Sequence, residues 1–323
     1  MTAKTDDRLV LSKEVVNLIL LDYNLGPADS INLIDGGALN TSYSVMTKHG
    51  KYILTICSNS SYSSVKKLAL LLNELKARDF RTTVPVVTKD GQFVGEFENT
   101  PILIKEFIEG SPLESTGYNQ NRLYEIGRQI SLFHNLDLEI GREKSIHLNH
   151  KNFENLISNL PMGQFRNIFD RSYAALLKEF PPDLPIGLVH ADIFADNIIV
   201  DSKGQPVIID FECVGYFPLV FDLSMAMVGI VFSHSNSVID YSHANSLLEG
   251  YLSKRVLSQN EMSNIQFFCK YGALGLALWR YNQYEVVFKD SRRIKPFHQM
   301  LDIYNNLNNM GSEVFLKQIL GVD

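Results

Sequence analysis

Residues 187–210 read GLVHADIFADNIIVDSKGQPVIID, and this stretch decides how the rest of the chain is interpreted. Four carboxylate or amide side chains, Asp192, Asp196, Asn197 and Asp210, flank short apolar runs there. One or two of them could be ordinary turn residues. Four of them beside buried segments indicate a site that holds a cation, because unpaired carboxylates are costly to bury.

The two apolar runs of this stretch predict a pair of short strands. Ile198 to Val200 and Val207 to Ile209 flank the turn residues Ser202, Lys203 and Gly204. Asp210 would then follow the second strand, which would fix its position.

The spacing His190-x-Asp192-x-x-x-x-Asn197, followed by Asp210-Phe211, matches the order of the protein kinase catalytic loop and its metal-binding Asp-Phe. Phosphoryl transfer needs alignment and charge neutralisation more than covalent help. A carboxylate must face the acceptor hydroxyl, and oxygen ligands must hold Mg²⁺ on the phosphates. The pattern therefore predicts Asp192 as the catalytic residue and Asn197 and Asp210 as metal ligands, with His190 as a structural partner of the loop.

Each of these residues also has a purely structural interpretation. Asp192 could belong to a turn, Asn197 could be a local cap, and Asp210 could end a strand with its hydrogen bonds satisfied. Asp196 is expected to be solvated or locally hydrogen-bonded. The functional interpretation depends on the set taken together and on a β-rich segment upstream.

Upstream of this stretch, the pattern predicts a helix after Ser12, then strands, a second helix and further strands. Asp90-Gly91 is a strong hairpin signal between the strands predicted next to it. The predicted strands are Ile31–Ile34, Thr41–Thr47, Tyr52–Cys57, Pro85–Thr88, Gln92–Phe97 and Ile102–Ile108, with the second helix over Ser63–Arg78.

From Gly110 onward the pattern is mostly helical, beginning with a helix that ends near His134. Helices are predicted at Leu219–Phe232, Asp240–Leu252, Met262–Tyr284 and Pro296–Asn308. The fold class is therefore α+β and bilobal, with a mainly antiparallel β lobe over 1–109 and a mainly helical lobe over 110–323. We expect a ligand in the cleft between them.

Composition narrows the class of partner. The 323 residues are 45% hydrophobic and 20% charged, which is typical of globular proteins. The formal net charge is −6 and no Lys/Arg cluster stands out, so nucleic acid is not an expected partner. The cysteines Cys57, Cys213 and Cys269 have no metal-binding spacing and are expected to be reduced. No leader and no membrane span are predicted, which favours the cytoplasm.

The chain resembles the aminoglycoside phosphotransferase and choline kinase superfamily over nearly its whole length. Within it, the chain is most similar to bacterial type II homoserine kinases. The resemblance implies a protein-kinase-like fold, Mg²⁺, ATP as co-substrate and a small hydroxylated metabolite as acceptor, L-homoserine first. The stretches that carry it are LDYNLG, GGALNTSYSV, KYILTI, PILIKEFIEG, LVHADIFADNIIV and VIIDF.

One departure from protein kinases concerns the phosphates. Thr55 stands where the strand Lys is expected, and Leu68 stands near the position of its partner Glu. The resemblance to homoserine kinases extends to this absence. Backbone N–H groups and small polar side chains of a Gly-containing turn would then hold the phosphates. The predicted nucleotide-binding residues are Gly36, Gly37, Asn40, Thr41 and Ser42 for the phosphates and Ile104, Glu106 and Ile108 for the adenine.

On the acceptor side, Arg280 is the candidate for a carboxylate and Glu212 for an ammonium or hydroxyl group. Asp222 is expected to cap a helix and to support the catalytic loop. Choline or an aminoglycoside stays open as the acceptor, as does a nucleotide-binding protein without turnover. Choline would need an aromatic cage, for which Tyr216, Phe217, Trp279 and Tyr281 are available. The sequence leaves the oligomeric state and the choice between ATP and GTP open.

Overall fold

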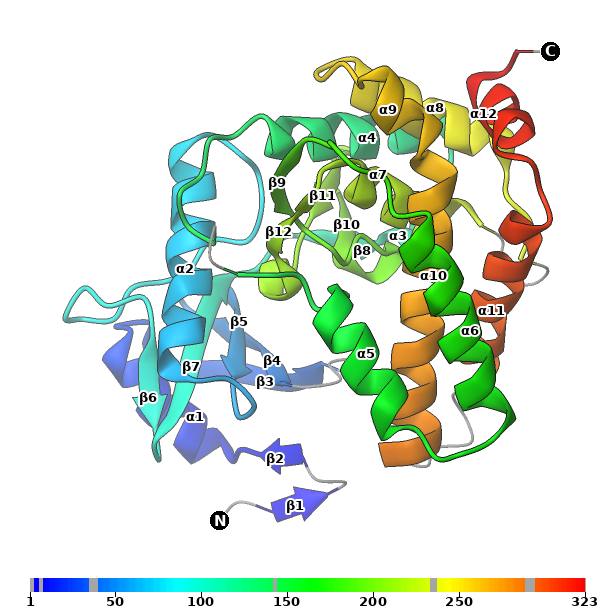
Figure 1. Ribbon diagram of the computed structural model, residues 1–323. Helices are drawn as coiled ribbons and strands as arrows, with labels where there is room; N and C mark the ends of the chain where they lie inside the picture. The colour runs from blue at the N-terminus through cyan, green and yellow to red at the C-terminus, as the bar shows by residue number, and fades with distance from the viewer. Residues whose placement is uncertain are drawn as a thin grey trace. The chain divides into compact units, whose positions relative to one another are not determined.

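The computed structural model describes residues 3–5, 8–34, 40–141, 144–232, 237–287 and 294–322. The chain divides into two compact units, Met1–Glu109 and Gly110–Asp323, and each is described by itself. Figure 1 labels the elements of both.

The N-terminal unit is built on an antiparallel five-stranded sheet with the order β3-β4-β5-β7-β6. Two helices and a separate two-stranded sheet, β1-β2, complete it. The elements are β1 Ala3–Thr5, β2 Arg8–Val10, α1 Lys13–Asp22, β3 Ala28–Ile34, β4 Thr41–Thr47, β5 Gly50–Ile56, α2 Tyr62–Ala77, β6 Gly95–Phe97 and β7 Thr100–Glu106.

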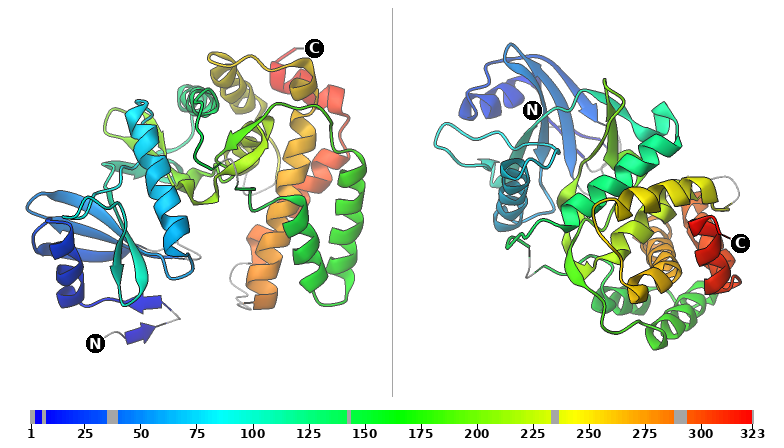
Figure 2. Two further views of the ribbon diagram at one scale, coloured as in Figure 1. Left: turned by 60° about the vertical axis from the view of Figure 1, so that its left-hand side comes forward. Right: turned by 90° about the horizontal axis from the view of Figure 1, so that it is seen from above.

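The alternation along the strands separates the two faces of this sheet. Leu54 and Ile104 point into a core that contains the buried face of α1. Leu103, one residue away on β7, packs instead with Val65 and Ala69 of α2. The two helices therefore cover opposite faces, as the ribbon in Figure 2 also shows.

The hairpin next to Asp90-Gly91 differs from the prediction. Residues 85–88 are not a strand: Pro85 forms one isolated bridge with Lys105, and the Asp90-Gly91 turn does not join two paired strands. The hairpin is instead β6–β7, and its turn residues Glu98 and Asn99 have φ of 49° and 61°. Positive φ at both central residues is the geometry of a type I′ turn, which an initial Glu does not signal.

The C-terminal unit is mainly helical, which confirms the predicted α+β architecture. Its long helix α10 packs against α5, α6, α7 and α11, while α4 pairs with α8 (Figure 1). The helices are α3 Leu113–Thr116, α4 Gln120–His134, α5 His150–Asn159, α6 Gln164–Lys178, α7 Val220–Ala226, α8 Tyr241–Leu252, α9 Gln259–Ser263, α10 Ile265–Tyr281, α11 Ile294–Asn308 and α12 Ser312–Leu320. Two π-helical turns, η3 Met227–Val231 and η4 Asn282–Val287, extend α7 and α10.

Short strands in this unit frame the stretch 187–210. The three-stranded sheet has the order β11-β10-β8, and the two-stranded sheet pairs β12 with β9. Their bounds are β8 Gly110–Pro112, β9 Ile186–Val189, β10 Ile198–Asp201, β11 Pro206–Ile208 and β12 Gly215–Pro218. Strands β10 and β11 were predicted from the sequence, whereas β8, β9 and β12 were not. Gly110 permits the β8–β10 pairing, because a Cβ there would lie 2.3 Å from the Val200 carbonyl oxygen.

Candidate active site

The predicted catalytic loop connects β9 to the 3-10 turn η1 Ala195–Asn197. Val189 at the end of β9 is fully buried, and His190 directly after it is 1% exposed. Strand β9 thus leads the chain from an exposed start at Ile186 into the interior and places the loop at its buried end.

His190 is bonded at both ring nitrogens. Its Nε2 lies 3.0 Å from the main-chain oxygen of Ile209, and its Nδ1 lies 3.3 Å from the main-chain nitrogen of Asp192. Since that N–H can only donate, Nδ1 accepts and Nε2 donates. Burial lowers the pKa of His190 and favours this neutral form. The ring also packs edge-on against Phe211, with centroids 4.6 Å apart. It links the loop to the segment around Asp210.

Asp222 holds the main chain of the same loop from α7. Its Oδ2 accepts the N–H of His190 at 2.6 Å, and its Oδ1 accepts that of Ala191 at 2.8 Å. Ala191 has a φ of 66°, a left-handed conformation that is uncommon for a residue with a Cβ. The expectation that Asp222 also caps a helix is wrong. It lies inside the first turn of α7, where Leu219 is the cap residue and no side-chain cap bond forms.

Asp192 and Asn197 contact each other directly. The Asn197 Nδ2 group donates to the main-chain oxygen and to Oδ2 of Asp192, both at 2.9 Å. Burial, together with the charges of Asp210 and Asp196, raises the pKa of Asp192 to about 7, against the effects of Asn197 and Arg280. The amide therefore fixes the carboxylate, and because Nδ2 is used for this, the Asn197 Oδ1 oxygen is the atom suited to a metal ion.

Asp210 follows β11 and is half-buried. It adopts a φ of 66°, and its carboxylate accepts the N–H of Glu212 at 3.4 Å. The main-chain bond from Ile209 N–H to the Asn197 oxygen, at 2.9 Å, ties the two predicted metal ligands to one hairpin. The sheet thus places two hard oxygen donors close in space from positions 13 residues apart.

The two oxygen donors of Asn197 and Asp210 suit an Mg²⁺ ion that is also bound by phosphate and water, and not a metal ion bound by protein side chains alone. In the described part of the chain, no three His, Cys, Asp or Glu side chains are grouped to hold an ion. Mg²⁺ in phosphoryl-transfer sites takes one or two protein ligands, and phosphate oxygens and water supply the rest. Asn197 Oδ1 and an Asp210 carboxylate oxygen match that need.

Arg280, near the end of α10, lies close to the catalytic loop that contains Asp192. Its guanidinium carbon is 5.9 Å from the ring centroid of Phe194, a residue of the catalytic loop. Burial lowers the pKa of Arg280, whereas the charges of Tyr284, Asp196 and Asp192 act to raise it. Two segments about 90 positions apart therefore bring a cation into the electrostatic range of the predicted catalytic carboxylate.

Glu212 is half-buried, and its main chain is held from the segment before α5. The Lys144 Nζ donates to the Glu212 main-chain oxygen at 2.6 Å. The neighbouring Cys213 has its thiol pKa raised by burial and by the charges of Asp192 and Asp210. Its thiol therefore stays protonated beside the site.

Two of the four aromatic residues considered for a choline cage pack among core rings. Phe217 is 8% exposed and lies edge-on to Phe221, with centroids 5.1 Å apart. Tyr281 packs against Phe165 and Phe297 at 5.0 and 4.9 Å. These two rings are used in packing, which weighs against a cage made of this set.

In the N-terminal unit, the predicted phosphate-binding residues surround the start of β4. Thr41 is buried, and the Ser42 hydroxyl lies 3.0 Å from that of Thr55 on β5, so the position of the absent Lys holds a partly buried cross-strand pair. Asn40 directly precedes the strand. Gly36 and Gly37 lie outside the described residues.

The residues predicted for adenine lie along β7 and just after it. Ile104 is fully buried in the core, and its carbonyl oxygen accepts the Val86 N–H at 2.8 Å. Glu106 is exposed, and its N–H donates to the Val84 oxygen at 2.8 Å. Ile108 is half-buried and follows the strand, so its main chain is the better placed of the three.

His134 was missed by sequence reasoning. Its Nε2 lies 3.0 Å from Asp222 Oδ2, although the two residues are 88 positions apart. A single His in the last turn of an amphipathic helix gives no signal of such a partner. Lys144 was also missed, because it lies in an irregular segment whose contacts cannot be predicted from a repeating pattern.

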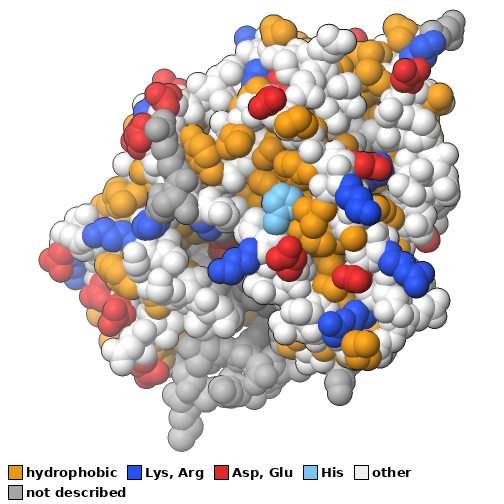
Figure 3. Space-filling view, in the orientation of Figure 1, with side chains coloured by type: hydrophobic (Ala, Val, Ile, Leu, Met, Phe, Trp, Pro, Cys, Tyr) orange, Lys and Arg blue, Asp and Glu red, His pale blue; other side chains and the backbone are white. Residues whose placement is uncertain are grey.

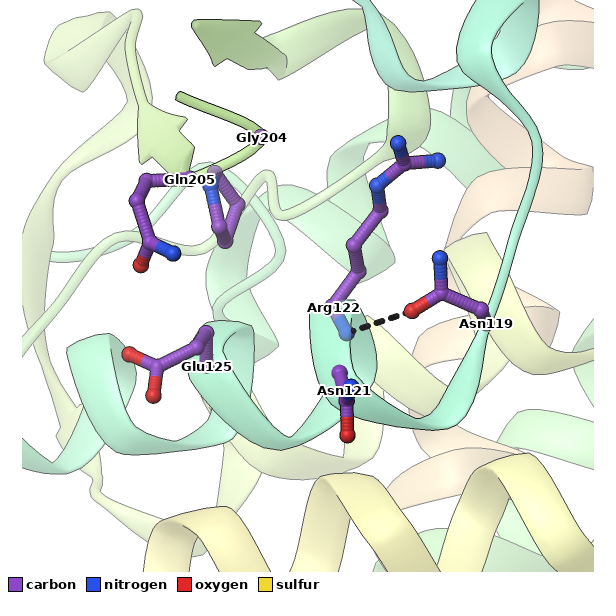
Figure 4. A pocket seen from close by; sticks show the side chains of 7 residues that line it. Asn119, Asn121, Arg122, Glu125, Gly204 and Gln205 are labelled. Atoms are coloured by element: carbon purple, nitrogen blue, oxygen red, sulfur yellow. Dashed lines mark hydrogen bonds between the residues drawn. The ribbon is translucent and has the colours of Figure 1, made fainter.

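A separate pocket of about 230 Å³ lies between the start of α4 and the β10–β11 turn (Figure 4). It is lined by Asn119, Asn121, Arg122, Glu125, Gly204, Gln205 and Pro206. It contains none of the predicted site residues and is smaller than ordinary small-molecule pockets. The Arg122 guanidinium is used there on the Thr116 and Gly117 carbonyl oxygens, at 2.6 and 2.7 Å. We therefore do not assign this pocket to the reaction.

The surface and the helices add two facts about partners. On the face shown in Figure 3, Lys and Arg side chains are interspersed with Asp and Glu rather than gathered. Among the helices of the described residues, none is long and apolar enough to cross a membrane.

Comparisons with known proteins agree with this geometry. A homoserine kinase of Methylobacterium nodulans is 26% identical over 274 residues, which cover 83% of this chain and 84% of that protein. The solved structure of amicoumacin kinase hAmiN with AMP-PNP, Ca²⁺ and Ami superimposes with a TM-score of 0.76 at 15% identity, over 95% of this chain and 97% of that one. A microcompartment-associated aminopropanol kinase gives 0.69 at 16% identity, over 96% and 99%. At such identities the structural likeness shows the shared fold.

The family assignment comes from the sequence model of the phosphotransferase enzyme family, APH, which matches residues 30–253. That match spans more than half of the chain and contains the whole catalytic loop. The chain therefore belongs to the APH phosphotransferase family and is a kinase of small hydroxylated molecules.

Proposed function

We propose that this kinase transfers the γ-phosphate of ATP to the hydroxyl group of L-homoserine. The observation that carries the proposal is the position of Arg280 on α10, with its guanidinium carbon 5.9 Å from the ring centroid of Phe194 in the catalytic loop and its charge acting on Asp192. A cation beside the catalytic loop suits an acceptor with a carboxylate. The similarity to homoserine kinases over 83% of the chain supports the same acceptor.

Asp192 is the residue that receives the proton of the acceptor hydroxyl. As the acceptor oxygen forms its bond to the γ-phosphorus, the bond from that phosphorus to the β–γ bridging oxygen breaks, and ADP leaves. The Asn197 amide, 2.9 Å from Asp192 Oδ2, keeps the carboxylate oriented during this step. A carboxylate with a pKa near neutrality is well matched to accept such a proton.

Asn197 and Asp210 are proposed to hold Mg²⁺ through oxygen atoms. When bound, the ion neutralises charge on the phosphates. It would also offset the Asp210 charge, which is the second-largest cause of the raised pKa of Asp192. Loading the site would therefore favour the ionised, proton-accepting form of Asp192.

The nucleotide is assigned to main-chain and small polar groups of the N-terminal unit. Asn40, Thr41 and Ser42 at the start of β4 supply such groups, and Thr55, which pairs with Ser42, occupies the strand position where a Lys would stand. For the adenine we propose main-chain contacts at Ile108, since the polar groups of Ile104 and Glu106 named above are already bonded to the main chain of Val86 and Val84.

A carboxylate-specific comparison tests the acceptor. 3-Aminopropan-1-ol is homoserine without its carboxylate, so the pair isolates that group. We expect wild-type kcat/KM to be highest for L-homoserine. Arg280→Met should lower it about 100-fold more for homoserine than for the amino alcohol, because only homoserine loses a charged pair, whereas the lost Arg280 charge near Asp192 affects both reactions.

Choline and an aminoglycoside complete the panel. If either exceeds homoserine by more than about tenfold in kcat/KM, a margin of ~1.4 kcal/mol, the acceptor assignment is wrong and the kinase assignment stands. If homoserine leads but Arg280→Met affects both amino compounds equally, the carboxylate is bound elsewhere. Absence of ADP release with every acceptor would instead favour nucleotide binding without turnover.

A further inference from the structure

A continuous line of buried side-chain hydrogen bonds, extended by the Arg255–Glu261 ion pair, leads away from the catalytic loop. From Asp222 Oδ2 it passes to His134 Nε2 at 3.0 Å, and from His134 Nδ1 to the Tyr251 hydroxyl at 2.8 Å. The Tyr251 hydroxyl lies 3.0 Å from Arg255 Nη1, and Arg255 Nη2 lies 2.7 Å from Glu261 Oε1. The side chains of His134 and Asp222 have no exposed surface. Tyr251 is also fully buried, and Glu261 is 1% exposed.

The donor and acceptor types give the direction of the bonds around a neutral His134 ring. The Asp222 carboxylate can only accept, so the ring proton lies on Nε2 and is donated to it. His134 Nδ1 then accepts the phenolic proton of Tyr251. The Tyr251 oxygen in turn accepts from the Arg255 guanidinium, which can only donate. Asp222 thus selects the tautomer of His134, and Arg255 holds the Tyr251 hydroxyl that the ring contacts.

The line joins four helices that are remote in sequence. His134 comes from α4, Asp222 from α7 and Tyr251 from α8, whereas Glu261 belongs to the capping box at the start of α9. Two glycines permit the α4–α8 contact. A Cβ on Gly127 would lie 2.0 Å from the Leu247 oxygen, and one on Gly250 would lie 1.8 Å from the Tyr124 oxygen.

At the loop, the line ends on main-chain groups that set the direction of Asp192. The Asp222 carboxylate accepts the N–H groups of His190 and Ala191, the second of which has its φ at 66°. A rotated Asp222 would release that strained residue, and Asp192 directly follows it. Small displacements of a reacting group lower the reaction rate strongly, because the alignment of the reacting groups supplies a large part of the rate enhancement.

We propose that Tyr251 and Arg255 are positioning residues for phosphoryl transfer. Through the His134 ring and the Asp222 carboxylate they hold the main chain of His190 and Ala191, and with it the orientation of Asp192. This inference rests on the proposed role of Asp192. It adds two residues on α8 and the segment after it, neither of which has a part in binding nucleotide or acceptor.

Tyr251→Phe tests the line because it removes the hydroxyl and keeps the ring. With Mg·ATP and L-homoserine, or the best acceptor of the panel above, we expect kcat to fall about tenfold, as for other partners that orient a reacting group. The KM for ATP should stay unchanged. Rates are expressed per folded site, counted from the stoichiometry of Mg·AMP-PNP binding.

Tyr271→Phe is the matched control. Tyr271 is 1% exposed in the same unit, and its hydroxyl donates one hydrogen bond, at 2.7 Å, to the Leu148 oxygen. Both variants lose one buried hydroxyl, so both should lose some melting temperature. Only Tyr251→Phe should lose kcat. Equal kcat in the two variants would show that Tyr251 has a structural role alone and would overturn the inference.

His134 supplies a rescue experiment. His134→Gln keeps a donor for Asp222 and an acceptor for Tyr251, whereas His134→Leu keeps neither, so kcat should be clearly higher for Gln. Equal kcat for the two would contradict the inference; if the Leu variant does not fold, the two Tyr variants decide. The Asp192→Asn variant distinguishes a failure of the proposed function from a failure of this inference. Full activity of Asp192→Asn would contradict the proposed role of Asp192. Loss of activity in Asp192→Asn together with unchanged kcat in Tyr251→Phe would contradict only the positioning role of Tyr251.

Discussion

At the scale of single residues, the candidate site depends on two positions with left-handed backbone, Ala191 and Asp210, both at φ 66°. Such residues cost of order 1–3 kcal/mol and persist where the surrounding structure determines them. Asp222 does this for Ala191 through two main-chain bonds. Asp210 is stabilised in part by its own carboxylate, which accepts the Glu212 N–H. These positions turn the side chains of Asp192 and Asp210 out of the strands they follow.

The first prediction concerns Asp192. Asp192→Asn keeps an oxygen for the Asn197 amide, so the loop should retain its conformation. We expect kcat to fall by about 10²–10⁴-fold with nearly unchanged ATP affinity, since the variant cannot take the hydroxyl proton. Steady-state kinetics with AMP-PNP titration measure both quantities.

Asp196→Asn is the control for this experiment, because Asp196 is exposed and lies four residues along the same loop. It should leave kcat nearly unchanged. Equal loss in the two variants would mean that general loop charge matters, and not the Asp192 carboxylate itself.

The second prediction concerns Asp210. We choose Asp210→Asn because Asn tolerates the left-handed conformation, whereas Ala adds backbone strain. Removing the negative charge of a hard ligand should abolish most of the Mg²⁺-dependent gain in ATP affinity. Calorimetric titration with and without Mg²⁺ measures that gain. A variant with the same gain as the wild type would exclude Asp210 as a metal ligand.

At the scale of elements, the packing of α4 against α8 determines whether His134 and Tyr251 meet, because each helix carries one of these two residues. The reciprocal contacts of Gly127 and Gly250 are with main-chain atoms, which cannot rotate away. Large side chains at these positions would separate the helices and lengthen the 2.8 Å bond between His134 and Tyr251.

The third prediction is that Gly250→Ala destabilises the protein. Alanine gains up to about 1 kcal/mol in helix propensity over glycine. The added Cβ would lie 1.8 Å from the Tyr124 oxygen, and such overpacking costs about 1–3 kcal/mol or more. We therefore expect a net loss in the free energy of unfolding, measured with urea.

Gly163→Ala is the control, since nothing lies within 4 Å of a Cβ there. Its unfolding free energy should change little. If Gly250→Ala were as stable as Gly163→Ala, the α4–α8 contact would be looser than the structure indicates.

At the scale of the whole molecule, the proposed function gives each unit its own contribution to the reaction. The N-terminal sheet offers main-chain and small polar groups without the strand Lys, and the helical unit offers the carboxylates, the amide and Arg280. Charge neutralisation of the nucleotide should therefore depend heavily on the metal ion.

The fourth prediction follows from this dependence. A ligand present at about 100 times its Kd adds ~2.7 kcal/mol to the free energy of unfolding. ATP with Mg²⁺ should therefore raise the melting temperature, and a chelator should remove most of the rise. Thermal denaturation of the wild-type protein with ATP, with and without EDTA, measures this. An equal rise in both conditions would show that the ion contributes little to nucleotide binding.

Much of the architecture was predictable from the sequence because it is encoded locally. Strand β4 has the predicted bounds Thr41–Thr47, since alternation over seven residues has only one sensible register against a core. The β6–β7 hairpin was misplaced, because the turn at Glu98 and Asn99 depends on backbone angles that these residues adopt only in context.

The sequence by itself predicted the reaction class, because the spacing from Asp192 to Asn197 to Asp210 places the proposed base and the two proposed oxygen ligands around a short hairpin. Only the tertiary structure decided which remote side chains lie at that candidate site. His134 meets Asp222 across 88 positions, and the Arg280 guanidinium carbon at the end of α10 lies 5.9 Å from the Phe194 ring of the catalytic loop. The physical reason is that spacing within a hairpin is fixed by local geometry, whereas contacts between distant helices depend on how closely their backbones pack, which glycines such as Gly250 allow.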